Sequence, residues 1–232
     1  MIRKYSKDIV IKRLYDGRPY QRGCVNYTGV SKENENYLEL LSRHILEKKD
    51  FDLMEYECRE EFVLHGKNGY RPKTQSEKGL CRFWYYKGFD EEELCQVLGK
   101  PIEYELNLFG NRVNIDLISY DKSARIIHLI EAKGKVAKGD DKYSSPETLL
   151  RCALEIKTYY ETLIQRKNTL IKQLMKAKKI DSANVMFELD VLVPMNDYFK
   201  EQTDKNKYPR LNELLKKWGI SVRFYKDFVR NY

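Results

Sequence analysis

Two acidic residues and a lysine, placed inside strongly apolar stretches near the middle of the chain, are the residues best suited to chemistry. Asp116 stands within residues 113–118, and Glu131 and Lys133 follow directly on the apolar run 126–130. Charged side chains are seldom buried without a partner or a task. Two carboxylates at one strand end form a site for a hard divalent cation such as Mg²⁺. A lysine beside them can hold a phosphate or a water bound to that cation.

The two stretches are predicted to be neighbouring strands of one hairpin, so side-chain alternation decides which residues share a face. Glu131 and Lys133 are two residues apart and share a face. A loop over residues 121–124 places Asp116 opposite Leu129. In that register Asp116 shares the face of Glu131, whereas a slip of one residue moves it to the other face. The alternative to a metal site is a buried Asp/Glu/Lys ion-pair network, which is costly to desolvate.

The elements around these strands follow from hydrophobic periodicity and from helix-end signals. Ser76 begins a helix, and Asp90 caps a second, shorter one. Residues 102–108 alternate apolar and polar side chains, as a half-buried strand does. Ser145 followed by Pro146 predicts the start of a helix after the loop. The chain then continues with one or two helices to residue 179, a strand over 185–193, a helix over 211–218 and a last strand over 220–225.

Residues 1–72 are expected to form an N-terminal extension made of a basic hairpin, a helix and a strand. The hairpin turns at residues 16–17, the helix covers residues 31–49, and residues 53–65 are extended. Lysines, arginines and tyrosines interleave in the hairpin. They predict either tyrosines packed on the core or a surface that follows a nucleic-acid backbone. A turn-rich stretch ends the extension, and residues 73–232 form the second domain.

Composition narrows the class of protein. The chain has 232 residues, a net charge of +8 and five cysteines without paired metal spacing. The basic balance favours a polyanionic partner, nucleic acid before membrane. Reduced thiols, the lack of an apolar leader and the lack of a long apolar run predict an intracellular, cytoplasmic protein. Three scattered histidines make a zinc site improbable by ligand spacing.

Asp116 followed by Glu131-Ala132-Lys133 resembles the PD-(D/E)XK nuclease superfamily. The likeness covers residues 76–193 and extends to the order of the elements. It implies an α/β (mixed α+β sheet) fold with a restriction-endonuclease-like αβββαβ core. It also implies that Asp116, Glu131 and the backbone carbonyl of Ala132 hold the metal, and that Lys133 orients or activates the attacking water.

The resemblance extends to helical residues on either side of the strands. Glu77 matches a glutamate that many members carry in the helix before the meander, although a plain helix-start acid explains it as well. Several related families carry Gln and Tyr four residues apart on the following helix, where this chain has Glu155 and Tyr159. With Glu in place of Gln, Arg151 is the better phosphate partner. Arg151, Tyr159 and Lys135 of the intervening loop are the predicted nucleic-acid contacts.

These expectations combine into a metal-dependent nuclease that uses Mg²⁺, with Mn²⁺ able to substitute, and cleaves DNA rather than RNA. The proline that names the motif is absent, since Ile115 precedes Asp116. A homodimer would suit the cutting of both strands of a duplex. The alternatives are a nucleic-acid-binding module without catalysis and an interaction protein on the same fold. His128 is expected to be structural, and Glu188 and Asp190 are acids that could face a second site.

Overall fold

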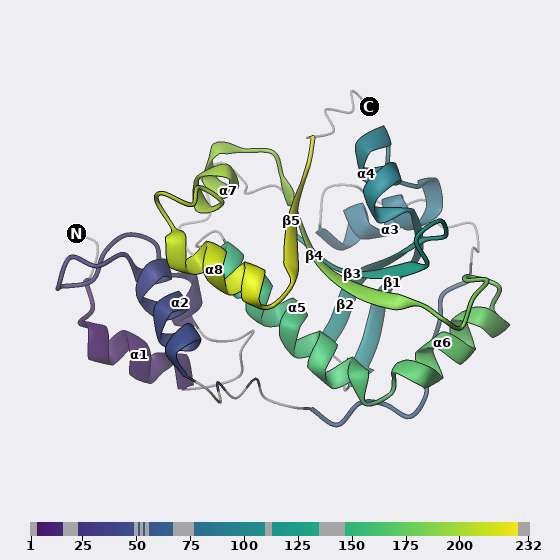
Figure 1. The fold of residues 1–232 in the computed structure, drawn as a ribbon, viewed down its shortest axis with the longest axis horizontal. Helices are drawn as coiled ribbons and strands as arrows, with labels where there is room; N and C mark the ends of the chain where they lie inside the picture. The colour runs from purple at the N-terminus through teal and green to yellow at the C-terminus, as the bar shows by residue number, and fades with distance from the viewer. Residues whose placement is uncertain are drawn as a thin grey trace.

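Helices cover both faces of a single sheet (Figure 1) in the computed structural model of the protein. The described residues are 4–15, 23–48, 51, 53, 56–66, 77–109, 113–134 and 147–226. Within these ranges, every helix is too short or too polar to traverse a lipid bilayer.

A five-stranded mixed sheet forms the centre of the fold, in agreement with the predicted α+β class. The strands are β1 (Lys100–Phe109), β2 (Val113–Asp121), β3 (Ile126–Ala132), β4 (Met186–Pro194) and β5 (Ile220–Tyr225). They lie side by side in chain order. The first three form an antiparallel meander, whereas β4 and β5 run parallel to β3.

Eight α-helices in the described ranges connect and cover these strands. They are α1 (Lys7–Tyr15), α2 (Tyr37–Glu47), α3 (Glu77–Lys87), α4 (Glu92–Leu98), α5 (Leu149–Ile164), α6 (Lys167–Lys176), α7 (Asp197–Gln202) and α8 (Pro209–Lys217). Parallel strands need a long crossover connection, and α5 with α6 supplies it between β3 and β4. Figure 1 shows α3 and α4 on one side of the sheet and α5 on the other.

Alternation along the central strands divides the apolar side chains between two cores. Ile118 and Leu129 point into the larger core, which also contains the apolar faces of α2, α5 and α8. Leu117 and Ile130 point into the smaller core, where they meet Trp84 and its neighbours on α3 and α4. Full burial of one such side chain contributes roughly 1.5–3 kcal/mol. The central strands are therefore held from both sides, which fixes the backbone that carries the acidic residues.

The hairpin register differs from the predicted one by two residues. Leu117 pairs with Ile130 and Asp121 pairs with Ile126, so the turn covers residues 122–125. Continuing this register by one residue places Asp116 opposite Glu131 and not opposite Leu129. Because side chains alternate with a period of two, the predicted face of Asp116 is nevertheless correct.

The helices on either side of the motif begin near their predicted positions. α3 begins at Glu77. α5 begins at Leu149, because Thr148 is its N-cap and accepts a hydrogen bond from the Arg151 amide at 3.2 Å. The predicted start at residues 145–146 lies outside the described residues. A buried hydrogen bond from the Thr148 hydroxyl to a backbone carbonyl anchors this cap, and that contact is not visible in local sequence.

Three smaller features also depart from the sequence-based predictions. Glu91, not Asp90, occupies the N-cap position of α4, and its side chain makes no capping hydrogen bond. The basic stretch after α5 forms the separate helix α6, which settles a point that the sequence left open. The stretch between β4 and α8, for which no helix is predicted, contains the short helix α7 with Asn196 as its N-cap.

The N-terminal region is helical where a basic hairpin is predicted. Lys7–Tyr15 forms α1, whose Val10 and Leu14 lie four residues apart and are fully buried. The hairpin prediction is therefore wrong, and its expected turn at 16–17 lies outside the described residues. Residues 56–66 form no strand of the sheet. Both regions contribute side chains to the larger core.

Glu39 of α2 connects the N-terminal region to the rest of the fold. Its carboxylate accepts hydrogen bonds from the Arg210 and Leu211 amides, at 3.0 and 3.1 Å. These amides are free donors at the start of α8, where a carboxylate is also favoured by the helix dipole. The helix α2 itself begins at Tyr37 with Asn36 as its N-cap, six residues after the predicted start.

Candidate metal centre

The predicted acidic residues meet at the end of the sheet where β3 ends and where α3 and α5 begin. Ligand-type oxygen atoms of Glu77, Asp116 and Glu131 all lie within 4.8 Å of one another. Asp116 and Glu131 come from adjacent strands, and Glu77 comes from the first turn of α3. Three carboxylates from three elements therefore converge, as the predicted ligand set requires.

Backbone amides fix two of these carboxylates. The Ala132 N–H donates to Asp116 Oδ2 at 2.9 Å, and the Gly134 N–H donates to Glu77 Oε2 at 3.3 Å. Ala132 thus belongs to the site through its amide, and the ligand role of its carbonyl oxygen stays a prediction. Glu131 has one buried oxygen, Oε2, without a hydrogen-bond partner in the described structure. Glu155 Oε2 is likewise buried without a hydrogen-bond partner there, so carboxylate oxygens of both residues are available as ligands in this region.

Lys133 lies at the centre of the acidic residues with its side chain buried. Its Nζ atom lies near four carboxylates: 2.5 Å from Glu131, 2.8 Å from Glu147, 3.3 Å from Glu155 and 3.6 Å from Glu77. Burial alone would lower the pKa of this ammonium group. The neighbouring carboxylates, with Glu131 foremost, outweigh burial and raise the pKa well above its usual value. Lys133 therefore carries its proton throughout the physiological pH range.

The start of α5 contributes two acids that were not among the predicted ligands. Glu147 contacts Lys133 just before the helix, and Glu155 contacts it from the second turn of α5. Arg151 lies between them, at 2.9 Å from Glu147 and 3.1 Å from Glu155. The four-residue spacing of these three side chains is visible in the sequence. Their approach to Lys133 is not, because it depends on how α5 packs against the sheet.

The carboxylates have unequal pKa values. Burial raises the pKa of Asp116 to about 7, against the opposing effect of Lys133. Burial, together with the charge of Asp116, raises the pKa of Glu131 well above its usual range. Burial also raises the pKa of Glu77. Glu155 differs, because Lys133 and Arg151 overcome the effect of burial and lower its pKa. Ionisation of the acids near the strands is therefore unfavourable in the metal-free protein.

The three predicted nucleic-acid contacts are placed differently. Arg151 has a quarter of its side chain exposed and pairs with two carboxylates. Tyr159 is buried, at 6% exposure, and its pKa is raised chiefly by burial and then by Glu131. It therefore presents little surface to a ligand. Lys135 lies outside the described residues.

His128 belongs to a separate cluster on the opposite face of the sheet from Glu131. Its Nδ1 atom lies 2.8 Å from Asp190 and 3.9 Å from Glu188. Arg223 pairs with the other oxygen of Asp190 at 3.1 Å. The fully buried Asp190 thus lies between a histidine and an arginine. This arrangement pairs a buried charge. Ligand-type atoms of His128, Glu188 and Asp190 also lie within 4.8 Å of one another, so the structural role expected for His128 stays a prediction.

Comparisons with protein-family models, with curated proteins and with solved structures find no match to this chain.

Proposed function

We propose that the protein is a divalent-cation-dependent nuclease whose core is of the restriction-endonuclease-like, PD-(D/E)XK type. The observation that carries the proposal is the convergence of Glu77, Asp116 and Glu131 within 4.8 Å, with Lys133 beside them. The order α3, α4, β1, β2, β3, α5, α6, β4 contains the αβββαβ order of that class, with α4 and α6 as additional helices. DNA is the expected substrate, and the basic balance of the chain supports a polyanionic one.

The donor set suits a hard divalent cation. Carboxylate oxygens are the ligands that Mg²⁺ and Mn²⁺ prefer. The centre holds five carboxylates (Glu77, Asp116, Glu131, Glu147 and Glu155) against two cationic side chains, Lys133 and Arg151. Burial raises the pKa values of Glu77, Asp116 and Glu131, and a bound cation would offset that cost by stabilising their ionised forms. Once ionised, these carboxylates repel a phosphodiester, so a cation would also be needed for substrate binding.

A bound divalent cation supplies positive charge to the phosphate and lowers the pKa of water. Asp116 and Glu131 would hold it from the strands, and Glu77 would add an oxygen from α3. Lys133 stays protonated, so it acts as a hydrogen-bond donor and a positive charge, not as a general base. Its ammonium group can orient the attacking water or stabilise the phosphate oxygens. Arg151 keeps guanidinium donors beyond those facing its two carboxylates, and these can hold a neighbouring phosphate.

Cleavage assays with matched variants test the proposal. Wild-type protein is incubated with single-stranded DNA, duplex DNA and RNA, each with Mg²⁺ or Mn²⁺. Asp116→Asn and Glu131→Gln should each lose more activity than the roughly 10–100-fold that removal of an outer-shell partner costs. Glu188→Gln removes an acid from the His128 cluster instead and should keep full activity.

Two outcomes would contradict the proposal. One is a wild-type protein that is inert on every substrate with both metals. The other is equal activity in the wild type and Glu131→Gln. Binding of nucleic acid that weakens with salt, without cleavage, would favour the alternative of a catalytically inactive binding module.

A further inference from the structure

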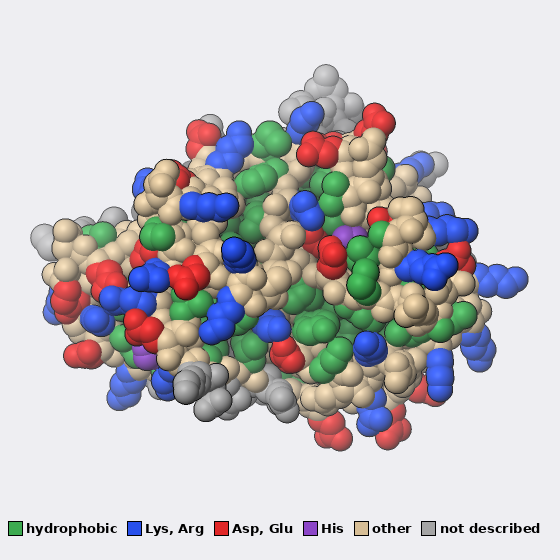
Figure 2. Space-filling view, in the orientation of Figure 1, with side chains coloured by type: hydrophobic (Ala, Val, Ile, Leu, Met, Phe, Trp, Pro, Cys, Tyr) green, Lys and Arg blue, Asp and Glu red, His purple; other side chains and the backbone are tan. Residues whose placement is uncertain are grey.

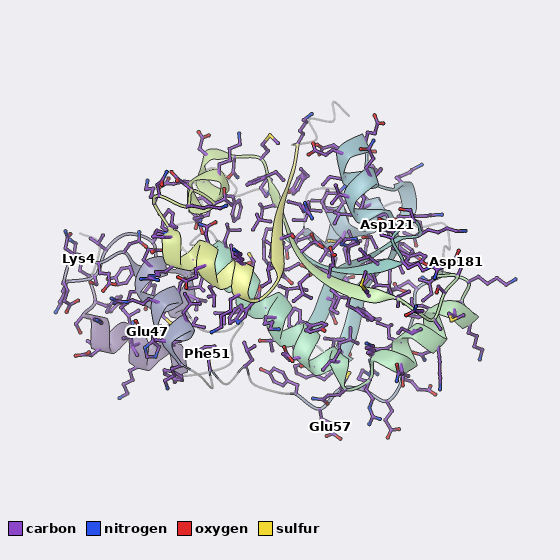
Figure 3. The ribbon with its side chains drawn as sticks, in the orientation of Figure 1. Lys4, Glu47, Phe51, Glu57, Asp121 and Asp181 are labelled. Carbon is purple, nitrogen blue, oxygen red and sulfur yellow. The ribbon has the colours of Figure 1, made fainter. Side chains whose placement is uncertain are left out.

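A cleft of about 420 Å³ opens at the end of the sheet opposite the metal centre. Its walls come from residues 64–66, Tyr85 of α3, the first residues of β1 and residues 177–179 after α6. β1 runs antiparallel to β2, and Asp116 lies beside its middle, near Glu105. About five residues separate that point from Lys100, which corresponds to roughly 17 Å along the strand. Figure 3 labels Asp121 and Asp181, which belong to this end of the sheet. The cleft is therefore distinct from the metal centre.

A buried charge network fixes the walls of the cleft. Glu103 is fully buried and accepts from the His65 amide at 2.9 Å and from Lys179 Nζ at 3.0 Å. Lys179 Nζ also donates to the carbonyl oxygens of His65 and Ile102, both at 2.8 Å. The Tyr85 hydroxyl donates to the same His65 carbonyl at 2.7 Å. Four segments far apart in sequence are thus joined around one opening. Buried ion pairs add little net stability, so a network of this kind is better explained by the geometry it specifies.

Two exposed lysines at the cleft, Lys100 and Lys178, can contact an anionic ligand. Lys179 forms an ion pair with Glu103. Lys100 and Lys178 are exposed, and neither has an ion-pair partner among the described residues. Lys178 has φ +55°, a left-handed conformation in which glycine is relaxed and other residues are strained by about 1 kcal/mol. A lysine at this position ends α6 and also lines the cleft. Figure 2 shows basic and acidic side chains interspersed over the visible face.

The remaining lining combines apolar groups with the polar ring of His65. Leu64, Pro101 and Ala177 contribute to the walls, whereas Tyr85 and Ile102 are almost fully buried behind them, and the described residues that line the opening include no carboxylate. Small-molecule sites have volumes of about 300–1,000 Å³ and combine apolar walls with a few fixed polar groups. A ligand that matches this lining has a flat apolar body and an anionic group. We infer that the cleft binds a nucleotide, with its phosphate at Lys100 and Lys178 and its base against Leu64 and the partly exposed ring of His65. This inference does not depend on the nuclease proposal.

Binding measurements on the full chain in EDTA test the inference, because EDTA removes any divalent cation through which the metal centre could hold a phosphate. Calorimetry with adenosine 5′-monophosphate tests a free nucleotide, and anisotropy with a labelled oligothymidylate tests a nucleotide within a strand. Lys100→Ala/Lys178→Ala should weaken binding of the active probe by at least about tenfold, the usual effect of losing hydrogen bonds to a charged group. The control Lys172→Ala/Lys176→Ala removes the same charge from exposed positions on α6 that do not line the cleft. Its affinity should stay within about twofold of the wild type.

The two probes distinguish a site for free nucleotides from a site for a nucleotide within a strand. Binding of the monophosphate assigns the cleft to free nucleotides, and binding of the oligonucleotide alone assigns it to a strand. Weaker binding of adenosine than of its monophosphate supports the phosphate contact. The inference is overturned if neither probe binds at millimolar concentration, or if both double variants lose affinity equally. Cleavage by wild-type protein is a separate readout, so failure here leaves the nuclease proposal in place.

Discussion

Replacing Asp116 with asparagine should stabilise the metal-free protein at pH 8. Burial raises the pKa of Asp116 from 3.8 to about 7, so the folded protein binds a proton more tightly than the unfolded chain does. Between those two pKa values the folded state holds the extra proton. The stability of the wild type therefore falls as the pH rises from about 4 to about 7, and stays lower above that. Asparagine is neutral and can still accept the hydrogen bond of the Ala132 amide.

The size of the effect follows from the pKa difference. At about 1.4 kcal/mol per pH unit, ionising Asp116 in the folded state costs up to about 4 kcal/mol. The carboxylate is partly exposed, and solvent screening reduces this cost. We expect Asp116→Asn to gain about 2 kcal/mol at pH 8, or roughly 4–8 °C in Tm for a chain of this size. At pH 4.5 the gain should nearly vanish.

Urea unfolding in EDTA at both pH values measures this difference. The exposed Asp8→Asn is the control and should change stability by less than about 1 kcal/mol at either pH. A variant that is no more stable than the wild type at pH 8 would refute the reasoning. Ionised Asp116 would then not destabilise the folded state. A gain of equal size at pH 4.5 would also refute it.

Three further predictions concern stability, measured by urea unfolding. Gly99→Ala should cost more than about 2 kcal/mol, because the residue has φ +67° and a Cβ would overlap the Tyr120 carbonyl. Gly219→Ala has a similar φ and open space around it, so equal losses in the two variants would exclude the overlap as a cause. Lys133→Met should cost about 3–5 kcal/mol in metal-free protein at pH 8, since it leaves buried carboxylates unpaired, and unchanged stability would contradict that. Asn36→Ala should cost about 1 kcal/mol through loss of the α2 cap, and no loss would show that the cap is replaced.

The meander and the motif could be predicted from the sequence because their signals are local. Alternating side chains identify β1, and continuous apolar runs identify β2 and β3. The predicted pairing of β2 with β3 differs from the observed pairing by two residues, because the turn begins one residue later than predicted. Asp121 accepts hydrogen bonds from the Ser123 and Ala124 amides, at 2.8 and 3.2 Å, and Arg125 adopts φ +57°. Both features favour a turn over residues 122–125. Moving a turn by one residue changes the pairing by two, and so preserves the shared face.

Other features depend on tertiary contacts that local patterns do not contain. The approach of Glu147 and Glu155 to Lys133 requires α5 to pack on the sheet in one orientation. The helix α1 was predicted as a hairpin because the interleaved tyrosines and basic residues outweighed a short apolar spacing. The four-residue spacing of Val10 and Leu14 indicates a helix only when their contacts with the larger core are known.

Mn²⁺ binding measured by electron paramagnetic resonance at pH 8 tests the metal centre most directly. The account predicts saturable binding by the wild type, a loss of at least about tenfold in affinity for Glu131→Gln, and wild-type affinity for Glu213→Gln. Both variants remove one carboxylate, but Glu131 belongs to the group with Glu77 and Asp116, whereas Glu213 is exposed on α8 and belongs to no metal-ligand group of the described residues. No binding at millimolar Mn²⁺, or equal affinity in the wild type and Glu131→Gln, would contradict the account.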